Sequence, residues 1–260
     1  MGSLVGKSPA NTYKSLLKVA DESNGVSTSI SRIEDGEGTA TCLEVSDDSL
    51  VLQPQNDDMT TTLRVRSNGG TDLLVVDSTN TAVKVGASQT PVNSQLLHFA
   101  GYRINAAGAA AGTHHFVPMG MGDYESNVGI NGGTGTDPST TIDLTTTTDE
   151  QVMYMFNVPI NITIDAVKVF SGTESGAKTY EFHLMSYTIS NDVDSDDGNL
   201  SDGTVVADGS VTVTSNQVLR QTALTIQSAS VSAGKVLMFS AESNGTEEFN
   251  INAQILYHFS

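Results

Sequence analysis

The chain has 260 residues, of which 12 are Lys or Arg and 30 are Asp or Glu, so its formal net charge is -18 at pH 7. A protein this acidic repels phosphate groups, which excludes nucleic-acid binding that depends on neutralising a phosphate backbone. Hydrophobic residues make up 38% of the chain, and no apolar run approaches the length of a membrane span. The abundance of Gly, Ser, Thr, Asn and Asp favours short strands joined by turns. The sequence therefore predicts an all-β protein without membrane insertion.

The N-terminal segment, residues 1–40, carries the one helix signal of the sequence. Ser8 is a suitable cap, Pro9 suits the first helical position, and Tyr13, Leu16 and Leu17 fall on one helical face. A helix of about ten residues is marginal alone in water. It should therefore dock on its own chain or on a partner, and a loose terminus is the alternative interpretation.

Short strand patterns follow over residues 41–90. Leu63, Val65, Val83 and Val85 alternate with charged residues, which is the pattern of strands that are wet on one face. Clusters of Asn, Gly, Asp, Ser and Thr between these strands are typical of tight turns. The segment has too little apolar surface to form a domain alone and leaves open sheet edges, which favour pairing with another chain. It is predicted to be a short β-stalk within an oligomer.

Residues 91–140 differ from both flanks because they are rich in Gly, Ala, Asn and Thr, and they are predicted to be a connector. Its two adjacent histidines, His114 and His115, would point to opposite faces of a strand. They are therefore not expected to bind one metal ion together without a bend in the chain.

Residues 141–260 have the pattern of a compact β domain. Ten of the fifteen aromatic residues lie here, so the main core is expected here as well. Gly, Asn and Asp clusters separate eight candidate strands, a spacing typical of a two-sheet β-sandwich of jelly-roll type. The candidate strands cover residues 141–145, 152–158, 162–170, 179–189, 204–213, 218–226, 235–241 and 248–259.

The strongest chemical cluster is a run of alternating carboxylates, Asp192, Asp194 and Asp196, which resembles the start of a calcium loop. However, Asp197 stands where an EF-hand has its turn glycine, and Gly203 stands in place of the bidentate glutamate. The EF-hand is therefore rejected. A loosely bound structural Ca²⁺ and a simple solvated turn are the two remaining interpretations, and no other cofactor is expected.

Motifs that would carry catalysis are absent from the sequence: it has no nucleophile elbow, Walker loop, HExxH motif or paired CxxC. The carboxylate pairs Asp149-Glu150 and Glu247-Glu248 are sequence neighbours, and neighbours on a strand diverge. The single cysteine, Cys42, is expected to be a small core residue and not a nucleophile. The chain is predicted not to be an enzyme.

A resemblance to the virion fibre and appendage proteins of tailed bacteriophages, particularly marine ones, rests on three stretches. The first is SPANTYKSLLKVADESNGVSTSISRIEDGEGTATCLEVSDDSLVLQP, with an NTYxxLL segment, an Asn-Gly turn and a DGxGT element. The second, TLRVRSNGGTDLLVVDSTNTAVKVG, is similar to the β-stalk unit of phage fibres. The third includes DAVKVFSGTESGAKTYEFHLMSYTI and GNLSDGTVVADG and looks like the globular tip domains of such fibres.

The resemblance implies a homotrimer located on the virion. Its N-terminal segment, with Pro9, Tyr13, Leu16 and Leu17, would anchor it to capsid or tail proteins, and its C-terminal domain would project. Because one or two stalk units fit into the chain, a short fibre or spike is expected, as a head fibre, a tail fibre or a capsid decoration. A host-surface glycan or protein is the expected external partner.

Two alternatives from other classes stay open at this stage. A carbohydrate-binding module could use Tyr154, Tyr187 or the acidic loop at residues 192–197, although the chain has no tryptophan to stack on a sugar. A polysaccharide depolymerase on the virion would need two carboxylates at catalytic separation.

Overall fold

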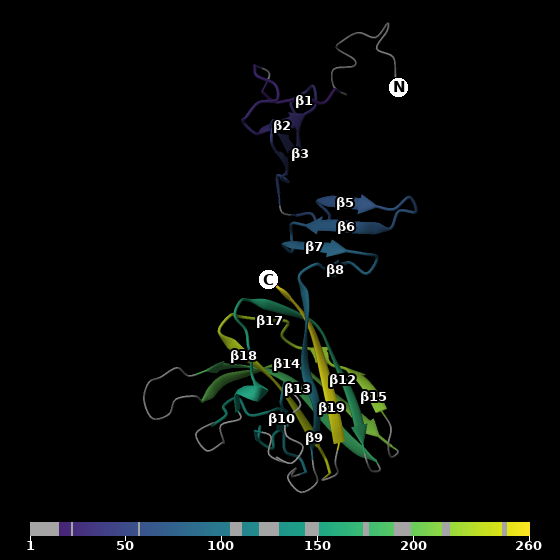
Figure 1. Ribbon diagram of the computed structural model, residues 1–260, viewed down its shortest axis with the longest axis vertical. Helices are drawn as coiled ribbons and strands as arrows, with labels where there is room; N and C mark the ends of the chain where they lie inside the picture. Colours follow the sequence, from purple (N-terminus) through teal and green to yellow (C-terminus); the bar gives the residue numbers. More distant parts are fainter. Residues whose placement is uncertain are drawn as a thin grey trace. The chain divides into compact units, whose positions relative to one another are not determined.

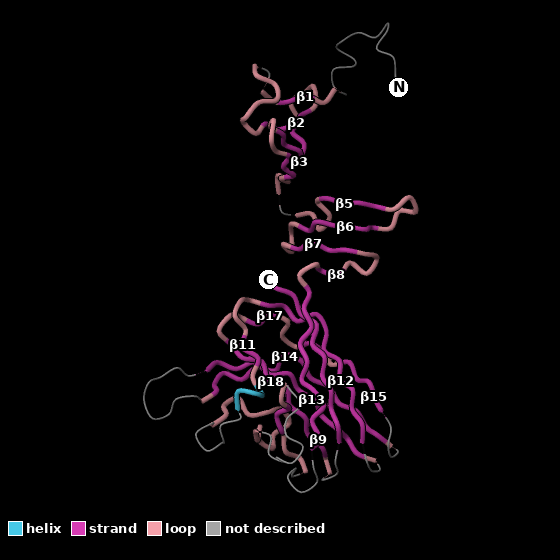
Figure 2. The backbone as a smooth tube through the Cα atoms, in the orientation of Figure 1, coloured by secondary structure: helices cyan, strands magenta, loops and turns pink. Residues whose placement is uncertain are grey.

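The structure is a computed structural model, which describes residues 16–21, 23–56, 58–104, 111–119, 130–143, 151–173, 177–189, 199–214, 219–245 and 249–260. Within these ranges the regular elements are strands, apart from one turn of 3-10 helix, η2 (Gln151–Tyr154) (Figures 1 and 2). The all-β class is thus confirmed. None of the helical segments described is long and apolar enough to cross a membrane. The chain divides into two compact units, Met1–Val92 and Asn93–Ser260.

Unit 1 contains two four-stranded antiparallel sheets in which strands adjacent in sequence pair with one another. The first sheet consists of β1 (Lys18–Val19), β2 (Ser31–Glu34), β3 (Ala40–Val45) and β4 (Leu50–Leu52). The second consists of β5 (Leu63–Arg66), β6 (Asp72–Asp77), β7 (Ala82–Val85) and β8 (Thr90–Pro91). The turn between β5 and β6 uses Gly70 at φ 84°, a conformation that glycine adopts without strain. The meander predicted for residues 63–86 is confirmed.

Unit 2 contains two larger antiparallel sheets. The front sheet has the order β15-β12-β19-β9, with β17 also paired to β12. Its strands are β9 (Ser94–Ile104), β12 (Ile162–Thr173), β15 (Leu219–Ala223), β17 (Ser230–Val231) and β19 (Phe249–Phe259). The back sheet has the order β10-β18-β13-β14-β16, with β11 also paired to β18. Its strands are β10 (His115–Val117), β11 (Phe156–Asn157), β13 (Lys178–Ile189), β14 (Leu200–Val213), β16 (Thr225–Ile226) and β18 (Lys235–Ser243).

The main core of unit 2 lies between these two sheets. Val167 and Ile255 of the front sheet and Phe182 of the back sheet belong to one buried cluster. An aromatic contact joins the layers, because the ring of Phe239 in the back sheet lies 6.0 Å from that of Phe99 in the front sheet. Within the back sheet the ring of Phe239 lies 6.3 Å from that of Phe182. Side chains that alternate between the two faces of each strand place every second residue in this core, and unit 2 is a β-sandwich, as predicted.

The outer face of the back sheet carries a second apolar cluster, which the segment at residues 130–143 covers. Met185 and Tyr187 lie in this cluster with Ile142 of the covering segment. The Tyr187 hydroxyl donates a hydrogen bond to the Ser139 carbonyl (2.9 Å), and the Gly203 amide donates to the Thr140 carbonyl (2.9 Å). The covering segment is thus fixed to the sheet by backbone bonds as well as by apolar packing.

Residues 91–140 are not the connector that their composition predicts. Ser94–Ile104 forms β9, an eleven-residue strand at the edge of the front sheet, and His115–Val117 forms β10 of the back sheet. Within β9, Leu97 and Phe99 are buried while Leu96 is exposed. This period-2 pattern was masked by the Gly and Ala residues around it. The boundary between the two units therefore falls at residue 92 and not near residue 140.

Three further expectations differ from the structure. Leu16 and Leu17 are not helical and precede the strand β1, while the rest of the predicted helix lies outside the described residues. Cys42 is exposed on β3 and is not a core residue. In place of the strand expected at residues 141–145, Ile142 makes a single bridge to Leu200, and the last two of those residues are not described.

Candidate functional site

The second sheet of unit 1 has one face made of aliphatic side chains. The strand register places Leu63, Val76 and Val83 in one cross-strand row. A second row on the same face follows two residues along each strand. We call this surface the β5–β7 apolar face, and it consists of Leu63, Val65, Leu74, Val76, Val83 and Val85.

The opposite face of this sheet carries charged side chains together with Val75, which is buried. Lys84 donates to the carboxylate of Asp77 at 2.7 Å, and the Asp77 side chain is buried. Burial alone would raise the pKa of Asp77, but hydrogen bonds from Lys84 and Asn80 outweigh it and lower this pKa to about 2. Arg64 lies on the same polar face and is exposed. The sheet thus has aliphatic side chains on one face and charged side chains around a buried valine on the other.

The first sheet of unit 1 repeats this division. Its apolar face contains two cross-strand pairs, Leu43 with Leu52 and Val45 with Leu50. Its other face carries two ion pairs, in which Lys18 lies 3.2 Å from Glu34 and Arg32 lies 2.7 Å from Glu44. These four aliphatic residues are named below as the β3–β4 apolar face.

Neither apolar face is covered within the described chain. Among the described residues of unit 1, only Val75 and Asp77 are buried. Val65 is 48% exposed and Leu50 is 67% exposed, although both lie in strands where an apolar side chain would normally be covered. Contiguous exposed apolar surface of this kind indicates a site of protein association.

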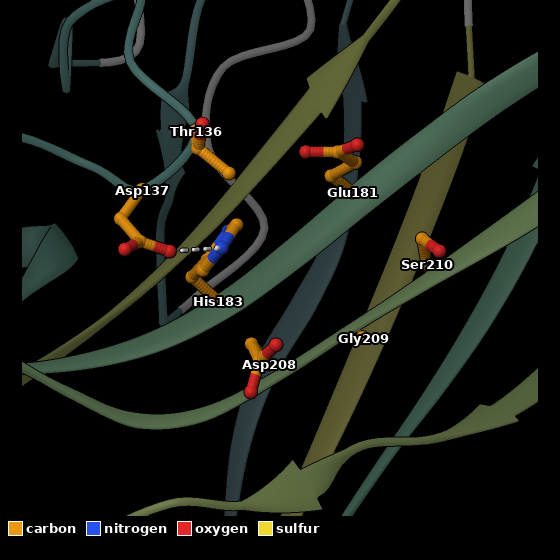
Figure 3. A pocket seen from close by; sticks show the side chains of 7 residues that line it. All are labelled: Thr136, Asp137, Glu181, His183, Asp208, Gly209 and Ser210. Atoms are coloured by element: carbon orange, nitrogen blue, oxygen red, sulfur yellow. Dashed lines mark ion pairs between the residues drawn. The ribbon is translucent and has the colours of Figure 1, made fainter.

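Unit 2 carries a polar pocket on the outer face of its back sheet, beside the second apolar cluster. The register pairs Glu181 with Ser210 and His183 with Asp208, so these four side chains share one face. The covering segment closes one side of the pocket, whose volume is about 190 Å³ (Figure 3). The lining consists of Thr136, Asp137, Glu181, His183, Asp208, Gly209 and Ser210.

A buried histidine pair lies against this pocket. The rings of His114 and His183 are 4.9 Å apart and nearly perpendicular. His114 Nε2 lies 3.0 Å from the Gly135 carbonyl oxygen, with which it forms a hydrogen bond. The same nitrogen also lies 3.0 Å from Glu242 Oε2, which makes no hydrogen bond of good geometry. One ring nitrogen carries at most one proton, so the carbonyl and the carboxylate compete for it.

His183 is 95% buried, and its Nε2 lies 3.3 Å from Asp137 Oδ1. Burial lowers the pKa of His183, and the neighbouring His114 lowers it further. Burial and His114 lower the pKa of His115 in the same way. Burial raises the pKa of Glu242. His115 and His183 are therefore uncharged at neutral pH.

These shifts predict that acid destabilises unit 2. A histidine whose pKa is lowered on folding binds fewer protons in the folded chain than in the unfolded chain, so its contribution to stability is lost as the pH falls below about 6.5. We expect the melting temperature to fall between about pH 7.5 and about pH 5.5. The raised pKa of Glu242 has the opposite effect, because it makes the folded chain more stable at low pH. The contribution of His183 is therefore measured as the difference in this pH dependence between a His183 variant and the natural chain.

The variant His183→Gln tests this expectation. The slope of melting temperature against pH should become shallower in His183→Gln than in the natural chain, because the buried ring no longer takes up a proton on unfolding. An unchanged slope would contradict the role assigned to the buried ring.

The structure does not bring together the site residues that the sequence singled out. Pro9, Tyr13 and the acidic residues Asp192, Asp194 and Asp196 lie outside the described residues. Leu16 and Leu17 are described, and both are exposed. Within the described ranges no group of three or more His, Cys, Asp or Glu side chains is arranged to hold a metal ion.

The aromatic residues considered for sugar stacking are not accessible. Tyr187 is fully buried and Tyr154 is 7% exposed, and both lie in the second apolar cluster. The suggestion that they form a stacking platform is therefore wrong. Both residues stabilise the packing between the covering segment and the back sheet.

The pocket was missed because its residues are far apart in the sequence. Asp137, His183 and Asp208 come from the covering segment, β13 and β14, and single polar residues in a strand look like ordinary outward-facing positions. A useful signal was the cluster of polar residues on the outward face of a strand otherwise rich in large apolar residues, as in the sequence YEFHL.

No protein-family model matches the sequence. No curated protein matches it either.

Two solved structures are weakly similar to this chain. One is that of the Clostridium thermocellum N-terminal endo-1,4-beta-D-xylanase 10B, comprising CBM22-1 and GH10 modules complexed with xylohexaose. The match has 10% sequence identity and a TM-score of 0.29, and it covers 65% of this chain and 25% of the xylanase chain. The other is an aminopeptidase from a marine sediment archaeon, Thaumarchaeota archaeon, at 9% identity and a TM-score of 0.34, over 72% of this chain and 40% of that one. This chain thus spans less than half of either protein, and similarities this weak assign neither a fold family nor a function.

Proposed function

We propose that the chain is a structural protein of a virus particle, a short trimeric fibre or spike of a tailed bacteriophage. In this proposal unit 1 is the stalk that joins three copies. Unit 2 is the projecting tip, which meets a host-surface ligand or decorates the capsid. The chain has no catalytic role in this proposal.

The observation that carries the proposal is the uncovered apolar surface of unit 1. Both of its sheets have one aliphatic face and one ion-paired face, and its described residues include only two buried side chains. A chain of this kind gains stability when copies bring their aliphatic faces together and exclude water, at about 25 cal/mol per Å² of apolar surface. The charged faces remain in solvent, where the acidic chain stays soluble.

The resemblance to phage appendage proteins supplies the number of copies and the location. Three sheets that face a common axis enclose one apolar interior, and each contributes the β5–β7 apolar face. Leu16 and Leu17 belong to the segment that resembles the virion anchor, and their exposure is compatible with contact to a capsid or tail protein.

The strand order supports a jelly-roll tip. The front sheet has the order β9-β19-β12-β15, and the back sheet contains the order β10-β18-β13-β14. Together these two orders match the connections of two interlocked Greek keys. Jelly-roll domains occur in viral capsid proteins and in lectins. Fold alone does not define function, so this agreement supports the proposal without carrying it.

Immunogold labelling of particles of the virus that encodes the chain tests the proposed location. Antibodies raised against unit 2 should label intact particles at a regular position, because unit 2 projects. Absence of label from intact and from disrupted particles would contradict a virion role.

A further inference from the structure

Four Asn-Gly dipeptides occur in the chain, beginning at Asn24, Asn68, Asn131 and Asn244. Such a dipeptide can modify itself, because the backbone nitrogen of the glycine can attack the side-chain amide carbon of the asparagine. Glycine favours this attack since it has no side chain and its backbone bends freely. A glycine N–H that is hydrogen-bonded elsewhere must first be released by local opening. The hydrogen bonds around the four dipeptides therefore decide which of them reacts in the folded chain.

The first dipeptide is fixed by one aspartate. The Gly25 amide donates to the Asp21 backbone carbonyl at 3.0 Å. The Asn24 side chain donates from Nδ2 to Asp21 Oδ2, also at 3.0 Å. The two groups that would have to meet are thus held by separate hydrogen bonds, so this dipeptide must open before it reacts.

The dipeptide in the covering segment of unit 2 is fixed in a similar way. The Gly132 amide donates to the His114 carbonyl at 2.7 Å. Asn131 Oδ1 accepts a hydrogen bond from the Gly133 amide, also at 2.7 Å. Both bonds have to break before the glycine nitrogen reaches the asparagine side chain.

The dipeptide that follows β18 is held by two strands of the back sheet. The Gly245 amide donates to the hydroxyl of Ser243, the last residue of β18, at 3.1 Å. Asn244 Oδ1 accepts a hydrogen bond from the amide of Thr179 in β13 at 3.0 Å. This glycine nitrogen is therefore also occupied in the folded chain.

The dipeptide Asn68-Gly69 differs because its glycine nitrogen is free. Both residues lie in the middle of the turn between β5 and β6, which the Gly70 amide closes by donating to the Ser67 carbonyl at 2.9 Å. In such a turn the hydrogen bond joins the first and fourth residues and leaves the amide of the third in solvent. Within the described part of the chain, neither the Gly69 amide nor the Asn68 side chain makes a hydrogen bond, and both residues are exposed.

We propose that Asn68 is a self-modification site of the folded chain, which reacts before the other three dipeptides. The Gly69 nitrogen gives up its proton to solvent and forms a bond to Asn68 Cγ, while the bond from Cγ to the side-chain nitrogen breaks and ammonia leaves. Water then opens the succinimide ring at either of its two carbonyl carbons, which gives aspartate or isoaspartate. One water is consumed and one ammonia is released. The reaction does not depend on the proposed function, because it uses only residues of one turn.

The modification changes the turn that joins β5 and β6. Both products replace a neutral amide by a carboxylate, so each adds one negative charge. Isoaspartate also adds one main-chain carbon between Ser67 and Gly70, whose hydrogen bond closes the turn. Because the length of a hairpin turn sets the strand register, this product should weaken that bond. The Gly70 amide should then exchange its hydrogen faster than in Asn68→Asp, which carries the same charge on a turn of natural length, and equal exchange would contradict this effect.

Incubation of the full chain at mildly alkaline pH, followed by peptide mapping with mass spectrometry, measures all four dipeptides in one sample. We expect Asn68 to convert at least about tenfold faster than the other three asparagines, because their dipeptides must first break hydrogen bonds. Both aspartate and isoaspartate should form at residue 68, since the ring has two carbonyl carbons. An equal rate at Asn24, Asn131 or Asn244, or no conversion at Asn68, would overturn the proposal.

Two controls separate the effect of the fold from that of the sequence. In concentrated urea the local hydrogen bonds are lost, so the four dipeptides should convert at rates within about threefold of one another. The variant Asn68→Gln keeps a side-chain amide in the turn but should not convert, because glutamine would have to form a larger ring. If the order of rates in the folded chain persisted in urea, or if aspartate formed without isoaspartate, the proposal would be overturned.

Discussion

Val65→Asp is expected to abolish assembly of the chain. Val65 lies on the β5–β7 apolar face beside Leu74 and is 48% exposed in the single chain. In a trimer each copy would place one ionised carboxylate inside an apolar interior, and three like charges would face one another. Burying an unpaired charge costs several kcal/mol per group. Sedimentation should therefore show monomers at concentrations where the natural chain is assembled.

The neighbouring residue provides the control. Arg64 lies one position away on β5 but on the polar face, and it is exposed. Arg64→Gln changes the net charge by the same amount as Val65→Asp, because one removes a positive charge and the other adds a negative charge. Assembly should survive Arg64→Gln. Loss of assembly in both variants would indicate that net charge and not the apolar face controls association.

Phe239→Ala should produce the largest loss of stability within unit 2. Phe239 is fully buried and lies between Phe99 of the front sheet and Phe182 of its own sheet. Removing a buried phenyl ring loses its transfer free energy and leaves a cavity, which together cost about 3–5 kcal/mol. Since domains are stable by only about 5–15 kcal/mol, a fall in melting temperature of about 10 °C is expected.

Leu219→Ala is the matched comparison, since Leu219 is an apolar residue of the same sandwich that is 71% exposed. Its effect on the free energy of unfolding should stay within about 0.5 kcal/mol. Chemical denaturation of both variants measures the difference. Similar losses from the two substitutions would contradict a core that lies between the sheets.

Strands of unit 2 such as β13 could be predicted because large apolar residues recur at every second position of their sequences. In β13, Tyr180, Phe182 and Leu184 are buried, and this period of two is visible without any tertiary information. Strand β9 was missed because Ala100 and Gly101 interrupt its apolar pattern and a Gly/Ala-rich stretch follows it. Its place in the sheet comes from nine residue pairs with β19, which only the tertiary structure specifies.

The amphipathic sheets of unit 1 were predictable in part. The alternation of Val65 with Arg64 and of Val85 with Lys84 indicated one wet face, but it could not show that the dry face stays uncovered within the chain. The pocket was not predictable. Asp137 and Asp208 are brought together by the covering segment and by the register of β14, and neither leaves a local signature in the sequence.

The oligomeric mass of the full chain tests the central proposal most directly. Sedimentation equilibrium at micromolar concentration should give three times the chain mass of 27.3 kDa. The apolar faces of unit 1 would then be covered by copies of the same chain. A monodisperse monomer under these conditions would contradict the proposal, because the aliphatic faces of both small sheets would then remain in water.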